Sequence, residues 1–222
     1  MHPYLKPVSR QFEKNSDATV AAWAKAYLKD QFEHFGLPTP LRRAICKEHF
    51  KSSLPDYNEL PAIVTDAWEQ PQREFHYLAV ELIAAMKKSW KPPVITVAEY
   101  MITHKSWWDT VDHVASEITG PYFKIFPQET EKITSKWNQS TNIWLQRSSI
   151  MFQKAYKSDT STVLLSKYIL NCSTSDEFFV QKAIGWALRE YSKSNPKWVT
   201  KFVRGHNLPK LSKKEALRRI IN

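Results

Sequence analysis

Glycine is scarce in this chain of 222 residues, which contains only Gly36, Gly120, Gly185 and Gly205. The tight turns of β-hairpins rely on residues that adopt positive φ angles, and glycine is the main one. Long stretches rich in alanine, leucine, lysine and glutamate favour helix instead. We therefore predict an all-α fold.

Apolar residues recur at helical spacing between turn signals, as they do over residues 75–83. Prolines, Pro121 among them, and short polar runs mark the expected turns. Gly36 is expected to end the helix that carries Tyr27, in the left-handed conformation. Residues that can cap a helix N-terminus precede several apolar runs, and these are Asp17, Ser106, Asn142, Ser175 and Ser212.

Similar groups of residues recur about every 36 to 38 positions, each near the start or middle of an expected helix. Such a period indicates stacked helix pairs of the HEAT type, although a continuous bundle without repeats is the alternative. We predict that residues 1–222 form a single domain, a right-handed solenoid with a concave basic groove. The recurring groups are Arg73–Phe75, Asp109–Asp112, Trp144–Arg147 and Lys182–Trp186.

Most of the formal charge of +10 is concentrated near the carboxyl end. From Phe179 onward there are eleven basic residues and two acidic ones, Glu190 and Glu215, so this segment alone carries +9. Such density suggests contact with a polyanion, because neutralising phosphates releases counterions and supplies affinity. A solubilising lysine-rich face is the alternative.

Several protein classes lack their required residues here. Cys46 and Cys172 cannot form a four-thiolate zinc site, an iron–sulfur cluster or a disulfide framework. The sequence has no glycine-rich phosphate loop and no zinc-deaminase or zinc-protease motif, so we expect no metal and no cofactor. With only two cysteines, we expect a reduced, cytoplasmic protein. Because the amino end has no apolar run of signal-peptide length and no uncharged apolar stretch approaches membrane-spanning length, we expect neither secretion nor a membrane partner.

The segment Ser106–Asp112 holds the first candidate site. Trp108 and Asp112 are four residues apart and project from one face of a helix, which places an aromatic wall beside an anion. Such a pair can bind a cation, although a structural role is the alternative for any Trp-Asp pair. Trp107 and Asp109 lie on other faces and are expected to be structural.

Two later helices carry further candidates. Arg147 follows an apolar run and suits bidentate phosphate binding, with a surface salt bridge as the alternative. Lys182, Trp186 and Arg189 share one helical stripe. Gly185 within that helix is costly unless another helix or a nucleic-acid backbone approaches closely, and we expect the helix.

These segments resemble the AlkD family of DNA alkylation repair glycosylases. The resemblance is carried by Lys105–Asp112, Asn142–Arg147 and Glu177–Tyr191, and it extends over essentially the whole chain. It implies a monomeric array of HEAT-like repeats that holds duplex DNA in a basic groove. The implied reaction is hydrolysis of the N-glycosidic bond of N3- or N7-alkylated purines.

The site residues of that family map to positions 27, 108, 112, 147 and 186 of this chain. The resemblance implies that Asp112 stabilises the developing cationic sugar, that Trp108 and Trp186 lie against the deoxyribose, and that Arg147 holds a phosphate. It also implies that the lesion is contacted through its sugar and backbone, without a base-shaped pocket. The residues expected to contact DNA are Tyr27, Arg147, Lys182 and Arg189.

Two other functions remain open from the sequence. Relatives exist that keep the fold and bind damaged or branched DNA without excising bases, and a protein-binding HEAT scaffold is the third class. The carboxylate at position 112 is the feature that favours the enzyme over the binder.

Overall fold

A computed structural model describes residues 1–220 and shows only helices, turns and loops there, apart from one isolated bridge between Glu33 and Gln72. The prediction of an all-α fold is confirmed. Contacts divide the chain into two compact units, Met1–Val97 and Ala98–Asn222, with the boundary inside α6 (Val94–Thr103). The single domain, the solenoid and its concave groove stay predictions.

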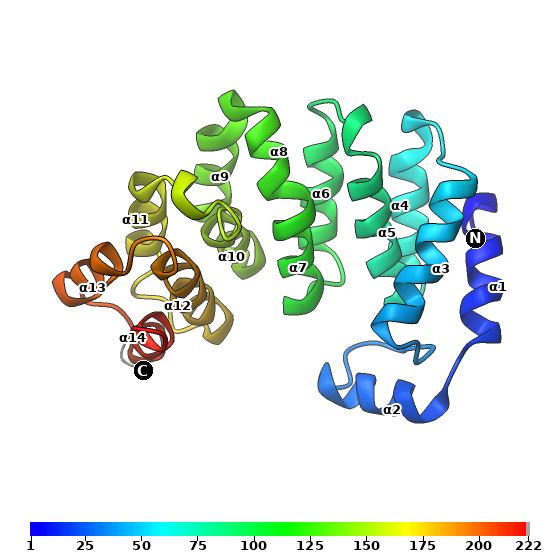
Figure 1. Ribbon diagram of the computed structural model, residues 1–222, viewed down its shortest axis with the longest axis horizontal. Coiled ribbons are helices and arrows are strands. Elements are labelled where there is room, and N and C mark those ends of the chain that lie inside the picture. The colour runs from blue at the N-terminus through cyan, green and yellow to red at the C-terminus, as the bar shows by residue number, and fades with distance from the viewer. Residues whose placement is uncertain (221–222) are drawn as a thin grey trace. The chain divides into compact units, whose positions relative to one another are not determined.

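The helices of the first unit pack around a core of aromatic side chains. Helix α3 packs against both α1 and α5, and α4 packs against α5 (Figure 1). Phe12, Trp68 and Phe75 are fully buried, and the rings of Phe12 and Phe75 lie 5.6 Å apart. The helices are α1 (Lys6–Lys14), α2 (Ala18–Tyr27), α3 (Thr39–Ser52), α4 (Leu60–Glu69) and α5 (Arg73–Ala85).

The loop between α2 and α3 is fixed by a buried carboxylate. Glu74 accepts hydrogen bonds from the backbone N–H groups of Phe35, Gly36 and Leu37 at 3.1, 2.9 and 3.3 Å. Gly36 has a φ of 85°, as expected, and a Cβ there would come within 2.0 Å of the Asp17 carbonyl oxygen. It lies well beyond the end of α2, however, so its expected role as the end of that helix is wrong.

In the second unit, α7, α10, α12 and α14 pack side by side in that order. Helices α9 and α11 pack on α10, and α13 packs on α12 and α14, which Figure 1 shows grouped at the C-terminal end. The helices are α7 (Trp108–Val114), α8 (Gly120–Ile125), α9 (Thr130–Asn138), α10 (Ile143–Met151), α11 (Thr162–Asn171), α12 (Phe178–Ser192), α13 (Pro196–Gly205) and α14 (Lys210–Leu217).

The chain does not turn at Pro121, which corrects the prediction. Helices α7 and α8 are joined by a π-helical turn, Ala115–Thr119, so the helical path continues from residue 108 to residue 125. Proline inside a helix lacks an N–H donor and crowds the carbonyl four residues earlier. The wider π-helical turn accommodates that conflict, and it begins three residues after Asp112.

The capping predictions were partly right. Asp17 and Asn142 cap α2 and α10, because each carboxyl or amide oxygen accepts two backbone N–H groups of the first turn. Ser106, Ser175 and Ser212 do not occupy N-cap positions. Ser106 and Ser212 instead donate to the carbonyls of Ile102 and Gln181, while Ser175 accepts from the Glu177 N–H ahead of α12.

Gly185 allows α14 to approach α12 closely, as predicted. A Cβ atom at Gly185 would lie 2.5 Å from Cβ of Glu215 and 3.0 Å from the Ser212 carbonyl oxygen. Since backbone atoms cannot yield as a flexible side chain can, any side chain at position 185 would push the two helices apart. This contact brings Glu215 up to the residues of α12 considered below.

We expect Gly185→Ala to lower the free energy of unfolding by about 1 to 3 kcal/mol, the usual cost of overpacking. Gly205→Ala is the matched control, because a Cβ there would meet no heavy atom within 4 Å and alanine has the higher helix propensity. Urea denaturation measures both. Equal stability of the two variants would contradict the close packing of α12 on α14.

Candidate functional site

The site centres on a bidentate ion pair between two helices. Arg147 on α10 donates from Nε and from Nη2 to the two carboxylate oxygens of Asp112 on α7, both at 2.7 Å. Its Nη1 donates to the Phe179 carbonyl of α12 at 2.6 Å. One guanidinium therefore links three neighbouring helices.

Burial makes this pair a strict geometric constraint. The side chain of Arg147 is 1% exposed and that of Asp112 is 13% exposed. Removing one member of a buried ion pair leaves the other charge without compensation, which typically costs about 3 to 5 kcal/mol. The carboxylate is thus held in one orientation while part of it still reaches the surface.

The indole of Trp186 lies beside this pair on α12, half-buried. The guanidinium carbon of Arg147 is 5.4 Å from the ring centroid of Trp186. Three further cations surround the same ring: Lys182, Arg189 and Lys154, at 5.4, 5.6 and 5.8 Å from the centroid. Each lies within the range of cation–π attraction.

Glu215 of α14 binds two of those cations. Lys182 and Arg189 each donate to one of its carboxylate oxygens, both at 2.8 Å. The hydrogen bond from Lys182 is the main cause that lowers the pKa of Glu215, with the charges of Lys182, Arg189 and Arg218 adding to it and burial opposing it. Glu215 thus ties α14 to the charged face of α12.

The structure brings together five of the seven residues predicted for the site. Asp112, Arg147, Trp186, Lys182 and Arg189 are connected by the contacts above. The DNA-binding roles predicted for Lys182 and Arg189 stay predictions.

Trp108 and Tyr27 are the two predicted residues outside those contacts. Trp108 is the first residue of α7 and lies half-buried one helical turn before Asp112. Tyr27 belongs to the first unit, is 55% exposed and stacks on Trp23 with ring centroids 5.4 Å apart. Its contact with DNA stays a prediction.

Arg147 was predicted to bind a phosphate, but in the structure its guanidinium is buried and binds groups of the protein itself. Its Nε and Nη2 atoms donate to Asp112, its Nη1 atom donates to the Phe179 carbonyl, and the side chain is buried. A phosphate contact stays a prediction. What the geometry shows directly is that Arg147 orients the Asp112 carboxylate.

Trp107 lies in an aromatic cluster next to the ion pair. Its ring centroid is 5.9 Å from that of Trp144 and 5.1 Å from that of Phe179. The Trp144 and Phe179 rings are 4.9 Å apart. This packing gives Trp107 the structural surroundings that the sequence predicts, and it steadies the Phe179 backbone that binds Arg147.

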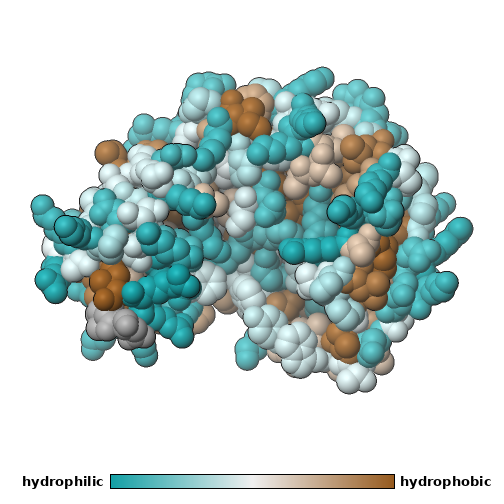
Figure 2. All heavy atoms as spheres, in the orientation of Figure 1, coloured by the Kyte–Doolittle hydropathy of each residue, from teal (hydrophilic) through white to brown (hydrophobic). Residues whose placement is uncertain are grey.

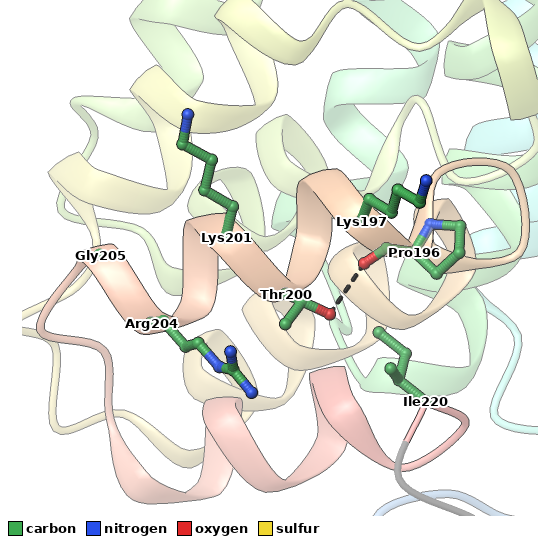
Figure 3. Close-up of a pocket in the computed structure, with 7 residues that line it drawn as sticks. All are labelled: Pro196, Lys197, Thr200, Lys201, Arg204, Gly205 and Ile220. Carbon is green, nitrogen blue, oxygen red and sulfur yellow. Dashed lines mark hydrogen bonds between the residues drawn. The ribbon is translucent and has the colours of Figure 1, made fainter.

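The basic carboxyl-terminal segment forms part of α12 and all of α13 and α14. Figure 2 shows a group of hydrophilic side chains at the C-terminal helices, next to a small hydrophobic patch. Beside α13 is a hollow of about 670 Å³ that contains Lys197, Lys201 and Arg204 in its lining. In Figure 3 Lys197 and Lys201 extend to one side of α13 and Arg204 to the other, so these cations do not converge on one point.

Three contributors to the site were not among the predicted residues. Glu215 could have been noticed, because an isolated acid within a basic segment is a natural ion-pair partner. The Phe179 carbonyl has no signal in the sequence, since any residue supplies a carbonyl. Lys154 lies in the turn after α10 and likewise stands in no motif.

Neither cysteine is a reactive thiol in this structure. Cys46 and Cys172 are both buried and unpaired. Burial raises the pKa of Cys46 to about 12 and also raises that of Cys172, which disfavours the nucleophilic thiolate.

Over residues 1–220, no helix has the length and apolar character needed to cross a bilayer, and no cluster of histidine, cysteine or acidic residues could hold a metal ion.

Comparisons with known proteins show which family this chain belongs to. Residues 8–220 match the family described as DNA alkylation repair enzyme. Among curated protein sequences, none matches the chain significantly.

Solved structures with the same fold agree with that family. A structure described as a predicted DNA alkylation repair enzyme from Enterococcus faecalis is 30% identical, has a TM-score of 0.87, and covers 92% of this chain and 96% of its own. AlkD2 from Streptococcus mutans is 16% identical with a TM-score of 0.63, over 90% of this chain and 98% of its own. The protein smu.31 from Streptococcus mutans UA159 is 17% identical with a TM-score of 0.62, over 90% and 97%.

The pH dependence of stability tests the bridge made by Glu215. Because its pKa is lowered in the folded state, its contribution is complete above the unfolded pKa of about 4.3 and disappears as pH falls through the folded value. We expect Glu215→Gln to cost about 1 to 2 kcal/mol at pH 7 and progressively less below about pH 4. Urea denaturation at pH 7 and below about pH 4 measures the free energy of unfolding of the variant and of the unmodified chain.

Glu131→Gln serves as the control for this measurement. Glu131 pairs with Lys167 at 2.8 Å, but its side chain is exposed, so its loss is expected to cost only a few tenths of a kcal/mol. A Glu215→Gln effect as small as this control, or one that does not change with pH, would contradict the bridge.

Proposed function

This chain belongs to the family of DNA alkylation repair enzymes, and from that premise we propose that it is a DNA glycosylase. Its proposed substrates are N7-alkylguanine and N3-alkyladenine in duplex DNA, and its proposed reaction is hydrolysis of the N-glycosidic bond. The observation that carries the proposal is the Asp112 carboxylate, fixed by Arg147 and partly exposed beside Trp186.

The chemistry of these lesions suits a site with one fixed carboxylate. An alkylated purine of this kind already carries a positive charge, so the base departs without a strong general acid. The barrier lies in the cationic, oxocarbenium-like sugar that remains. A carboxylate beside that sugar stabilises the developing charge, and it can also orient or deprotonate the attacking water.

Asp112 retains the capacity for this role although it is ion-paired. A carboxylate has about four lone-pair positions, and Arg147 occupies two of them. Within residues 1–220 no other hydrogen bond engages this carboxylate, so the remaining positions can face a sugar or a water. Pairing with a cation weakens the field of the carboxylate but fixes its position, and a fixed charge needs no reorganisation when the transition state forms.

Under this proposal Arg147 is a positioning residue that acts through Asp112. Trp108 and Trp186 provide aromatic surfaces for the deoxyribose.

Positive charge provides the proposed attraction for DNA. Lys182 and Arg189 lie beside Trp186, and the remaining basic residues of α13 and α14 extend the same charge along the second unit. Tyr27 on α2 is a proposed contact from the first unit. Binding of this kind weakens steeply as salt rises, because it depends on counterion release.

The proposal predicts release of free 7-methylguanine from methylated duplex DNA. Asp112→Asn keeps the size of the side chain but removes its charge, so we expect release to fall at least a hundredfold, the scale seen when an electrostatic contact to the transition state is lost. Single-turnover kinetics with excess protein measure the rate, and fluorescence anisotropy checks that duplex binding persists.

Glu117→Gln is the matched control, because it removes a carboxylate that is exposed on the π-helical turn just after α7. Its release rate should equal that of the unmodified chain. If the unmodified chain binds DNA but leaves methylated duplex intact, the glycosylase proposal fails and a non-catalytic DNA-binding role takes its place.

A further inference from the structure

Lys154 occupies a defined position in the turn that follows α10. Its backbone N–H donates to the Met151 carbonyl at 2.9 Å, and its side chain is half-buried. The Nζ atom lies 5.8 Å from the ring centroid of Trp186. The residue therefore borders the same aromatic surface as the Asp112–Arg147 pair.

The charges around Trp186 do not balance. Four cations surround the ring, but only two carboxylates engage them: Asp112 binds Arg147, and Glu215 binds Lys182 and Arg189. No carboxylate within residues 1–220 forms an ion pair with Lys154. The site thus carries two positive charges in excess, and Lys154 is the cation that has no anionic partner in this part of the chain.

A hollow adjoins Lys154 on the side of α12 that follows Trp186. It has a volume of about 290 Å³, and Lys154, Lys157 and Lys193 contribute to its lining. Glu190, the acid that also lines it, is already bound by Lys193. The space is therefore bordered by positive charge, with its one carboxylate already neutralised.

We propose that Lys154 binds a backbone phosphate of DNA next to the nucleotide whose sugar packs on Trp186. This proposal rests on the DNA-binding part of the function proposed above, but not on base excision. Each deoxyribose in a strand is joined to a phosphate on either side, so a sugar at Trp186 brings phosphate within reach of the surrounding cations.

Lys154 is better placed for this contact than its neighbours. Arg147, Lys182 and Arg189 would have to share donors with the carboxylates that already hold them. The ammonium group of Lys154 gives up no ion pair. Its three donors and flexible stem suit a phosphate oxygen whose position varies slightly with the lesion.

Lys154→Met tests the proposal because methionine keeps an unbranched apolar stem and removes only the charge. The probe is an undamaged duplex, whose dissociation constant is measured by fluorescence anisotropy at several salt concentrations. We expect binding about tenfold weaker at moderate salt. We also expect the slope of log K against log salt to become shallower by about 0.9, the value for one lost phosphate contact.

Lys136→Met on α9 is the matched control, since Lys136 is exposed and lies in the same unit. Its salt slope should stay that of the unmodified chain, and Lys154→Arg should restore binding. Thermal unfolding of each variant shows whether Lys154→Met changes the fold, an effect that would not by itself alter the slope.

The outcomes separate this inference from the glycosylase proposal. If Lys154→Met keeps the slope and affinity of the unmodified chain, or if Lys136→Met loses as much, Lys154 is not a phosphate ligand even when excision is observed. If the slope falls in a chain that binds DNA without excising bases, the inference stands and the glycosylase proposal fails. An unmodified chain without salt-dependent DNA binding overturns both.

Discussion

The bidentate pair between Arg147 and Asp112 is the interaction on which the rest of the site depends. It joins α7 to α10, and the third bond of the guanidinium, to the Phe179 carbonyl, adds α12. Because the arginine is buried, it cannot exchange its partners for water without a large free-energy cost. These bonds fix the positions of the three helices relative to one another. They also hold the partly exposed Asp112 carboxylate in one orientation.

A second link extends this arrangement to α14. Gly185 lets α14 approach α12, and Glu215 then reaches both Lys182 and Arg189. These two cations share the Trp186 ring with Arg147 and Lys154, so the packing of helices and the arrangement of charge have the same structural origin. A change in packing at Gly185 would alter the charges around Trp186 as well.

Sequence patterns predicted the all-α fold and named five residues that the structure brings together, but they specified few of the contacts among those residues. Asn142 as a cap and Gly185 as a close-packing position follow from local chemistry, which is readable in a single segment. Pro121 was misread because tertiary packing keeps its helix continuous through a π-helical turn. The Asp112–Arg147 pair and the bridge through Glu215 join residues 35 or fewer positions apart in the chain but on different helices, and no periodicity specifies which side chains meet there.

The most direct test asks whether Arg147 positions the Asp112 carboxylate. Arg147→Lys keeps a positive charge but cannot form the bidentate contact with Asp112. We predict that this variant binds methylated duplex nearly as well as the unmodified chain, while release of 7-methylguanine at saturating protein falls about a hundredfold, because a misplaced catalytic group costs that much. Weakened binding with an unchanged rate at saturation would contradict the account, because it would make Arg147 a phosphate ligand and not the residue that positions Asp112.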